Sequence, residues 1–301
     1  MNEFLNKVIS SNIGKVEKKV FLSKYTTYKV GGMAEAIIYP KNIDALITLI
    51  KLIKFYKVQY KVLGNGSNVL FSDKKYNGVL IKLSEFNHIE WNNNKVTVGA
   101  GVSLPKLSLM AAKKSLTGLE FAAGIPGTIG GAVFMNAGAY KSDMGYIVSS
   151  VKVLTRDLKI INMTNREMDF HYRTSFLKKH PTYICLEATL KLRKGKKDAI
   201  ESVIKERRKR RMESQPLEYA SAGSVFRNPE GMFAGELIEK SGLKGLKKGG
   251  AMISNKHANF IVNTGNASSD DIKYLIDFAH DTVKKNYKVD MKIEQEFVNW
   301  E

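Results

Sequence analysis

The stretch "YASAGSVFRNP", residues 219–229, places Ser224 behind a turn of small residues and ahead of an arginine and an asparagine. A hydroxyl in this setting can act as a nucleophile, a helix cap, a turn residue or a proton donor. The nucleophile elbow of hydrolases requires Gly-x-Ser-x-Gly, but Ala222 and Phe226 occupy the two glycine positions. The pattern therefore argues against an acyl-transfer nucleophile and leaves the other roles open.

A second chemical segment is "VLGNGSNVL", residues 62–70, in which a predicted strand runs into a polar turn. The turn residues are Gly64, Asn65, Gly66, Ser67 and Asn68. Two glycines let backbone N–H groups converge, and the serine and asparagine side chains add donors, which favours an anion nest suited to a pyrophosphate. Val69 at the third glycine position and the lack of Gly-Lys-Ser/Thr exclude the Rossmann and Walker fingerprints. Taken alone, the segment is equally compatible with an ordinary tight turn.

The third segment, "GLEFAAGIPGTIGGAVFMNAGAY" at residues 118–140, is rich in glycine and alanine and almost uncharged. Small residues allow the backbone to approach a flat, bulky ligand closely, although a tightly packed buried loop is the alternative. Together with the first glycine-rich turn, the segment suggests a dinucleotide bound mainly by backbone amides.

The elements that position these segments follow from hydrophobic periodicity. The N-terminal part has β-α-β order, the middle is a mixed α+β sheet region, and a second α/β pattern follows the lysine-rich "RKGKK" at 193–197 and the charged helix after it, which form the candidate linker. The predicted strands are 34–40, 58–64, 78–83, 95–101, 149–155, 158–163, 182–192, 257–263 and 291–300; the predicted helices are 43–57, 103–115, 234–243 and about 270–287, the last capped by Ser268 or Ser269.

Length and charge bound the class of protein. A chain of 301 residues with 44% hydrophobic and 26% charged residues is expected to fold into more than one domain. The net charge of +19 is compatible with nucleic acid, anionic lipid or an anionic small substrate as partner. Its densest run, "KERRKRRMES" at 205–214, is either a solvated helix face or a contact for a phosphate-bearing ligand.

Cys185 is the only cysteine, so an internal disulfide or a cysteine metal site is excluded, and its apolar surroundings predict a buried strand thiol. The N-terminus lacks the order of a signal peptide, and the most apolar helix carries several charges, so we expect a cytoplasmic protein without membrane insertion.

A family resemblance joins these segments. The motifs "YTTYKVGGMAE", "GNGSNVL", "AAGIPGTIGGAVFMNAGAY", "HYRTSF", "SAGSVFRNP", "HANFIVN" and "IEQEF" occur in the order typical of UDP-N-acetylenolpyruvoylglucosamine reductase, the MurB family, from about residue 25 to the end. The lack of a tyrosine-bearing insertion between Ser224 and His257 resembles the shorter, second type of this family.

The resemblance implies an α+β chain with an FAD-binding fold of the vanillyl-alcohol-oxidase (PCMH) type in two subdomains, residues 1–61 and 62–197, and a C-terminal α/β substrate-binding domain, residues 198–301. It implies noncovalent FAD, NADPH as reductant, and reduction of an enolpyruvyl ether to a lactyl ether in peptidoglycan precursor synthesis. The FAD contacts expected from the two glycine-rich segments are Gly64, Asn65, Gly66, Ser67, Asn68, Gly124, Ile125, Pro126, Gly127, Thr128, Gly131 and Asn136.

The resemblance also assigns three catalytic roles. Hydride delivery to an enol ether beside a carboxylate leaves an enolate, which needs a clamp on the carboxylate, a polar partner and a proton for carbon. Arg173 of "HYRTSF" matches the clamp, Glu296 of "IEQEF" the catalytic carboxylate and Ser224 the proton donor. Strand alternation places Glu294 on the same face as Glu296, so the choice between them rests on the family motif.

The expected substrate contacts are Tyr172, Arg227 and Asn228, next to the catalytic positions. The role of His257 stays open, and Ala220 and Val298 depart from residues common in the family. The partner expected is a small UDP-sugar, with no nucleic acid, no metal and a monomeric chain. Two rival interpretations are a flavin oxidase of the same superfamily and a nonenzymatic nucleic-acid binder, but the latter leaves both glycine-rich segments unexplained.

Overall fold

The predicted β-α-β start of the chain forms a four-stranded sheet in the computed structural model, which describes residues 1–300. The sheet order is β1-β2-β5-β3, and β3 pairs with β5 in parallel. Its elements are β1 (Gly14–Phe21), β2 (Met33–Pro40), α2 (Ile43–Phe55), β3 (Gln59–Val62) and β5 (Tyr76–Ile81). The sequence did not predict β1, because its lysines and glutamate mask any strict alternation of apolar and polar residues.

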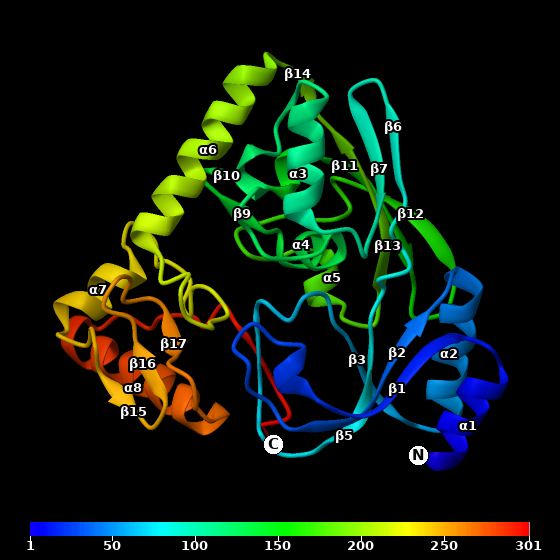
Figure 1. Cartoon of the computed structure of the whole chain (residues 1–301), viewed down its shortest axis with the longest axis horizontal. Helices are drawn as coiled ribbons and strands as arrows, with labels where there is room; N and C mark the ends of the chain where they lie inside the picture. The colour runs from blue at the N-terminus through cyan, green and yellow to red at the C-terminus, as the bar shows by residue number, and fades with distance from the viewer. Residues whose placement is uncertain (301) are drawn as a thin grey trace. The chain divides into compact units, whose positions relative to one another are not determined.

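Helix α2 forms where the apolar stripe and a cap coincide. The Asn42 side chain accepts a hydrogen bond from the backbone N–H of Ala45 at 2.9 Å and so satisfies one free donor of the first turn. The stripe is buried at Ala45, Leu46, Leu49, Ile50 and Ile53. Helix α1 (Asn2–Ser10) packs against α2, and the two helices lie together in Figure 1.

The middle of the chain forms an antiparallel five-stranded sheet of order β12-β11-β13-β7-β6. Its strands are β6 (Ile89–Asn92), β7 (Lys95–Gly99), β11 (Val148–Leu154), β12 (Ile160–Thr164) and β13 (Ile184–Lys191). Central strand β13 is mostly buried and contains Cys185, which confirms the predicted buried thiol. Burial raises the pKa of Cys185 to about 12.

Further helices and two-residue strands belong to this part of the chain, and α4 packs on β13 and β7. They are α3 (Leu104–Lys113), β8 (Leu116–Thr117), α4 (Ile129–Met135), β9 (Gly138–Ala139), β10 (Ser142–Asp143), α5 (Phe176–Lys179), β14 (Arg193–Lys194) and α6 (Lys197–Ser214). Part of the predicted linker is therefore ordered as a strand, because β14 pairs with β8. The basic run 205–214 lies on α6, as predicted.

The last hundred residues build an α/β core with its own apolar cluster. The elements are α7 (Ala234–Lys240), β15 (Lys247–Lys248), β16 (Ala251–Ile253), β17 (Ile261–Asn263), α8 (Ser269–Tyr287) and β18 (Glu296–Val298), and β18 pairs in parallel with β4 (Val69–Phe71). The predicted strands 257–263 and 291–300 are thus shorter than expected, since their first residues, and residues 299–300 after β18, form loops.

The chain forms two compact units. Unit 1 holds residues 1–18, 35–65 and 78–209; unit 2 holds residues 19–34, 66–77 and those from 210 on. The boundary near the C-terminal region falls inside α6, between Lys209 and Arg210. The three-domain division of the sequence stays a prediction.

The N-terminus of α8 is stabilised by a capping box formed by Ser268 and Asp271. Ser268 is the cap: its Oγ accepts from the N–H of Asp271, and the Asp271 carboxylate accepts from the N–H of Ser268, both at 3.0 Å. Burial raises the pKa of Asp271, but hydrogen bonds from Ser268 and Gly250 outweigh burial, so the pKa is lowered overall.

We expect Ser268→Ala to lower the free energy of unfolding by about 1 kcal/mol at pH 7. Because the folded pKa of Asp271 lies below the unfolded value, its own contribution is present above the unfolded pKa and is lost as pH falls through the folded pKa. Urea unfolding at pH 7 and in acid measures this loss. The exposed Ser202→Ala on α6 is the control, and an equal effect of both variants would refute the cap.

Candidate active site

Arg173 lies in a tight loop of unit 1 that follows the five-stranded sheet's β12. His171 and Thr174 exchange two backbone hydrogen bonds of 3.1 and 3.0 Å across it. Arg173 itself has φ +56°, in the left-handed region. That conformation costs a residue other than glycine about 1–2 kcal/mol, so the surrounding contacts must stabilise it.

The C-terminal end of α4 supplies those contacts. Asn136, itself left-handed and buried, donates its Nδ2–H to the His171 carbonyl and accepts from the Gly145 N–H, both at 2.9 Å. The Ser175 hydroxyl donates to the Phe134 carbonyl at 2.7 Å. The Asn136 side chain therefore holds the arginine loop in place, and its contact with FAD stays a prediction.

The Arg173 guanidinium is oriented by two neighbours. Its Nη2 donates to the carbonyl of Gly138 at 2.9 Å, and its carbon lies 5.1 Å from the centre of the Tyr172 ring. Lys178 donates from Nζ to the Arg173 carbonyl at 3.5 Å. A planar, oriented guanidinium of this kind suits a carboxylate better than a lysine does. The sequence missed Lys178, which carries no motif of its own.

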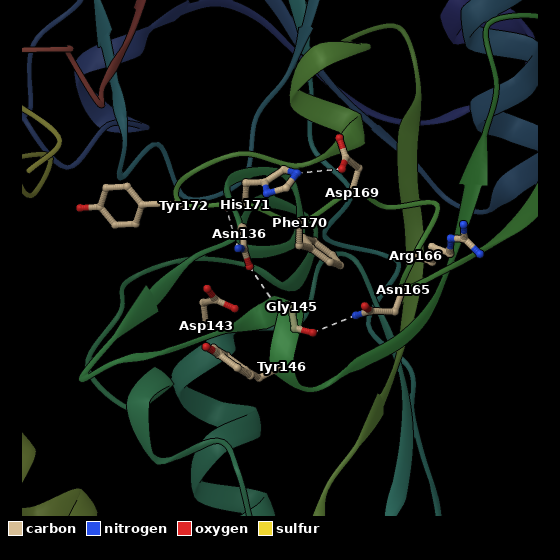
Figure 2. Close-up of a pocket in the computed structure, with 10 residues that line it drawn as sticks. All are labelled: Asn136, Asp143, Gly145, Tyr146, Asn165, Arg166, Asp169, Phe170, His171 and Tyr172. Atoms are coloured by element: carbon tan, nitrogen blue, oxygen red, sulfur yellow. Dashed lines mark hydrogen bonds and ion pairs between the residues drawn. The ribbon is translucent and has the colours of Figure 1, made fainter. Parts of the chain in front are cut away.

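A pocket of about 370 Å³ lies beside this loop (Figure 2). The pocket is polar, and Oδ1 of its Asp169 lies at hydrogen-bond distance, 2.9 Å, from Nε2 of His171. The Tyr172 ring points away from these two side chains (Figure 2). The residues that line it are Asn136, Asp143, Gly145, Tyr146, Asn165, Arg166, Asp169, Phe170, His171 and Tyr172. Of the predicted site residues it contains only Asn136 and Tyr172.

The two glycine-rich segments meet within unit 1. A Cβ on Gly64 would lie 2.8 Å from Oγ1 of Thr128, whereas a Cβ on Gly127 would meet nothing within 4 Å. Thr128 caps α4 by accepting from the Gly131 N–H at 3.3 Å. Lys82, which the sequence missed, donates to the Gly64 carbonyl at 2.7 Å, and burial lowers its pKa. Bare backbone faces open space at Gly127, which fits a ligand held by backbone amides.

The other half of the first turn belongs to unit 2. Gly66 has φ +64°, and a Cβ there would lie 2.2 Å from the Tyr25 carbonyl, so only glycine fits. Its carbonyl accepts from the N–H of Thr27 at 3.1 Å and from the Thr27 hydroxyl at 3.3 Å. The turn is therefore fixed by the "YTTY" segment, which the sequence did not connect with it.

Ser224 occupies a partly buried loop of unit 2 that is fastened on its C-terminal side. Asn259 accepts from the N–H of Val225 through its backbone and from that of Phe226 through its side chain, both at 2.9 Å. Its Nδ2–H donates to the Phe226 carbonyl at 2.8 Å. The N–H of Glu294 donates to the Val225 carbonyl at 2.8 Å, which joins the loop to the "IEQEF" segment.

Glu296 opens strand β18, and its N–H donates to the Asn68 carbonyl at 2.9 Å. Asn68 in turn donates from its side chain to the Glu294 carbonyl at 3.2 Å. Gln295 is buried between two partly exposed glutamates, which is the alternation predicted from sequence. The predicted site segment at residues 294–296 is thus hydrogen-bonded both to residue 68 of the first turn and to residues 222–225 of the Ser224 loop, all in unit 2.

The predicted substrate residues of unit 2 differ in their surroundings. The Oδ1 of Asn228 accepts from the Ala234 N–H at 3.1 Å, so part of this side chain has a structural role. The Nε of Arg227 is buried and has no hydrogen-bond partner among residues 1–300. Such a donor is normally satisfied, so an oxygen of a ligand would fit here. His257 accepts from the Asn259 N–H at 3.2 Å, and burial lowers its pKa.

No helix within residues 1–300 is long and apolar enough to span a membrane. In the same part of the chain, histidine, cysteine and acidic side chains form no group of three or more that could hold a metal ion.

The fold and the family comparisons place this chain among the FAD-binding oxidoreductases. Residues 34–164 match an FAD binding domain family. A glucose dehydrogenase, wild-type Phl p 4.0202, shares the fold with a TM-score of 0.51 at 15% identity, over 65% of this chain and 44% of that one. The predicted FAD-binding fold and cofactor class are confirmed.

The particular family follows from closer relatives. Residues 215–298 match the UDP-N-acetylenolpyruvoylglucosamine reductase C-terminal domain. A reductase of that name from Bacillus cereus and one from Bacillus subtilis are each 44% identical over 299 residues, 99% of both chains. The crystal structure of MurB from Thermus caldophilus superimposes with a TM-score of 0.80 at 37% identity, over 94% of this chain and 98% of that one. The chain belongs to the UDP-N-acetylenolpyruvoylglucosamine reductase family.

Proposed function

We propose that this chain uses NADPH to reduce the enolpyruvyl group of UDP-N-acetylglucosamine enolpyruvate to the lactyl group of UDP-N-acetylmuramate. The single observation that carries the proposal is the hydrogen bonding, within unit 2, of the Ser224 loop to the "IEQEF" segment that ends in Glu296 and Phe297. The family resemblance assigns the proposed proton donor and the proposed carboxylate to these two segments.

The residues proposed to hold FAD come from both glycine-rich segments. The close approach of Gly64 to Thr128 and the open space at Gly127 support this assignment. When bound, FAD supplies the hydride for the terminal enolpyruvyl carbon. The proposed contacts are Gly64, Asn65, Gly66, Ser67, Asn68, Gly124, Ile125, Pro126, Gly127, Thr128, Gly131 and Asn136.

Three side chains are proposed to handle the charge and the proton. The Arg173 fork binds the substrate carboxylate and so stabilises the negative charge that develops on it. The Ser224 Oγ–H gives its proton to the carbon next to that carboxylate. Glu296 is the polar partner of the enolate, and it helps only when protonated or hydrogen-bonded, because two negative charges repel.

Tyr172, Arg227 and Asn228 are proposed to bind the rest of the UDP-sugar. The buried Nε of Arg227 supports a contact with a phosphate or sugar oxygen, because a charge-assisted hydrogen bond would satisfy it. The exposed side of the Tyr172 ring is available for a flat or apolar part of the ligand.

Purified protein, reconstituted with FAD, tests the proposal by its visible spectrum. We expect a yellow protein that bleaches with NADPH under anaerobic conditions and regains its colour when UDP-N-acetylglucosamine enolpyruvate is added. A protein that cannot take up FAD, or a reduced protein that the enolpyruvyl sugar nucleotide fails to reoxidise, contradicts the proposal. Reduction of the flavin by an alcohol or sugar, followed by its reoxidation with oxygen, would instead indicate the oxidase alternative.

A further inference from the structure

Gln295 connects the Ser224 loop to a buried tyrosine, and neither the motif nor the proposed chemistry accounts for it. Its side chain is 5% exposed, and its Nε2 lies 3.3 Å from the Ala222 and Gly223 carbonyls and 3.5 Å from that of Ser224. Its Oε1 lies 3.1 Å from the Tyr28 hydroxyl. We propose that Gln295, oriented by Tyr28, is a positioning residue that holds Ser224 in place for proton transfer, an inference that rests on the proposed function.

The orientation of the Gln295 amide follows from its neighbours. Carbonyl oxygens only accept hydrogen bonds, so the NH₂ group must face residues 222–224 and the oxygen must face Tyr28. The Tyr28 hydroxyl is then the donor to that oxygen. Tyr28 is fully buried, and burial raises its pKa, so the hydroxyl stays protonated and keeps donating at all ordinary pH values.

Tyr28 is itself fixed, which makes it a suitable anchor. Its ring is part of the unit 2 core together with Val30 and Leu70, and its carbonyl accepts from the Asn263 side chain at 3.0 Å. Asn263 also donates its backbone N–H to the Ala220 carbonyl at 2.9 Å. The anchor and the start of the Ser224 loop are thus tied to the same residue of β17.

Ala222 and Val225 of the loop are buried in the unit 2 core, but Gly223 and Ser224 between them are only partly buried and need a further anchor. Gly223 has φ +75°, and a Cβ built on it would meet nothing within 4 Å, so no side chain packs there. Asn259 restrains the chain only from Val225 onward. The Gln295 side chain reaches the carbonyls of residues 222–224. Its NH₂ group is shared among three long hydrogen bonds, each of which is weak, but together they restrict the conformation of the turn.

The place of Gln295 in the chain explains why the contact concerns catalysis and not only folding. Gln295 directly precedes Glu296. One short segment therefore carries the proposed carboxylate and forms hydrogen bonds to the loop that carries Ser224, the proposed proton donor. Removing the Gln295 hydrogen bonds leaves the Glu296 carboxylate and the Ser224 hydroxyl in the protein but allows the hydroxyl to move. A misplacement of about 1 Å can slow a reaction about 100-fold, so partial loosening should still be measurable.

The test compares Gln295→Met and Tyr28→Phe with the wild-type chain, all loaded with FAD. We expect reduction by NADPH within about twofold of wild type, and reoxidation by the enolpyruvyl sugar nucleotide slower by about tenfold for Gln295→Met and about threefold for Tyr28→Phe. Hydrogen exchange of the amides at residues 223–225 should become faster in both variants without any ligand. Thr264→Val, which removes a hydrogen bond to the Gly250 carbonyl elsewhere in unit 2, is the matched control.

A double-mutant cycle with Ser224→Ala separates positioning from general destabilisation. If Gln295 acts through Ser224, adding Gln295→Met to Ser224→Ala slows reoxidation by less than about twofold further. An undiminished tenfold effect in that background, or normal rates in Gln295→Met alone, would overturn the inference while the role of Ser224 stands. Normal reoxidation in Ser224→Ala itself would overturn both.

Discussion

Ser224→Ala is expected to slow reoxidation of the reduced enzyme by the enolpyruvyl sugar nucleotide by about 10²–10⁴-fold, the usual contribution of a positioned proton donor. Reduction by NADPH should change by less than about twofold, because no proton from this hydroxyl is needed in that half of the reaction. Stopped-flow absorbance of the flavin measures the two halves separately.

Ser221→Ala is the matched control for Ser224→Ala, since it removes a hydroxyl three residues earlier in the same loop. It should leave both half-reactions nearly unchanged. Equal damage to both halves in Ser224→Ala would mean that Ser224 acts through FAD binding or through folding, and the proton-donor role would be wrong.

Arg173→Lys is expected to lower the rate of the same substrate half-reaction by about 10²–10³-fold, the cost of losing one donor to a developing oxyanion. Lysine keeps the charge but loses the planar fork and the hydrogen bond from Nη2 to the Gly138 carbonyl. The expected effect therefore concerns geometry and not net charge.

Arg166→Lys provides the comparison for Arg173→Lys, because Arg166 is exposed on the nearby pocket and has no proposed role in the reaction. Its half-reactions should match those of the wild type. If Arg173→Lys keeps more than about half of the wild-type rate, charge alone suffices and the carboxylate fork is not required.

The glycine-rich segments were predicted in part from the sequence, and their contacts are visible only in the structure. Their composition was enough to predict backbone contacts with a dinucleotide and to exclude the Rossmann and Walker types, since backbone freedom is a local property of glycine. That the Gly64 backbone lies against Thr128, and that Lys82 holds its carbonyl, depends on contacts between distant residues. No local pattern encodes such contacts.

Some helices and strands follow from the local sequence pattern, whereas others depend on the elements that pair with them. Helix α2 and the buried β13 have strong periodicity and were predicted, whereas β1 and the ladder β8–β14 are stabilised by their neighbours and not by their own pattern. Strands β17 and β18 begin later than predicted because Asn259 and Glu294, which precede them, instead form backbone hydrogen bonds with Val225 of the Ser224 loop.

Motifs of neighbouring residues suffice to identify Ser224, Arg173 and Glu296 as candidates, and the family resemblance that these motifs carry implies an FAD-binding chain. Hydrophobic periodicity, also a property of neighbouring residues, predicts the α+β order of helices and strands. Only the tertiary structure determines the left-handed backbone of Arg173 and the hydrogen bond by which Asn136 stabilises that loop. The same holds for the hydrogen bonds from Gln295 to residues 222–224. Hydrogen bonds between residues tens or hundreds of positions apart form only once packing brings them within about 3 Å of one another.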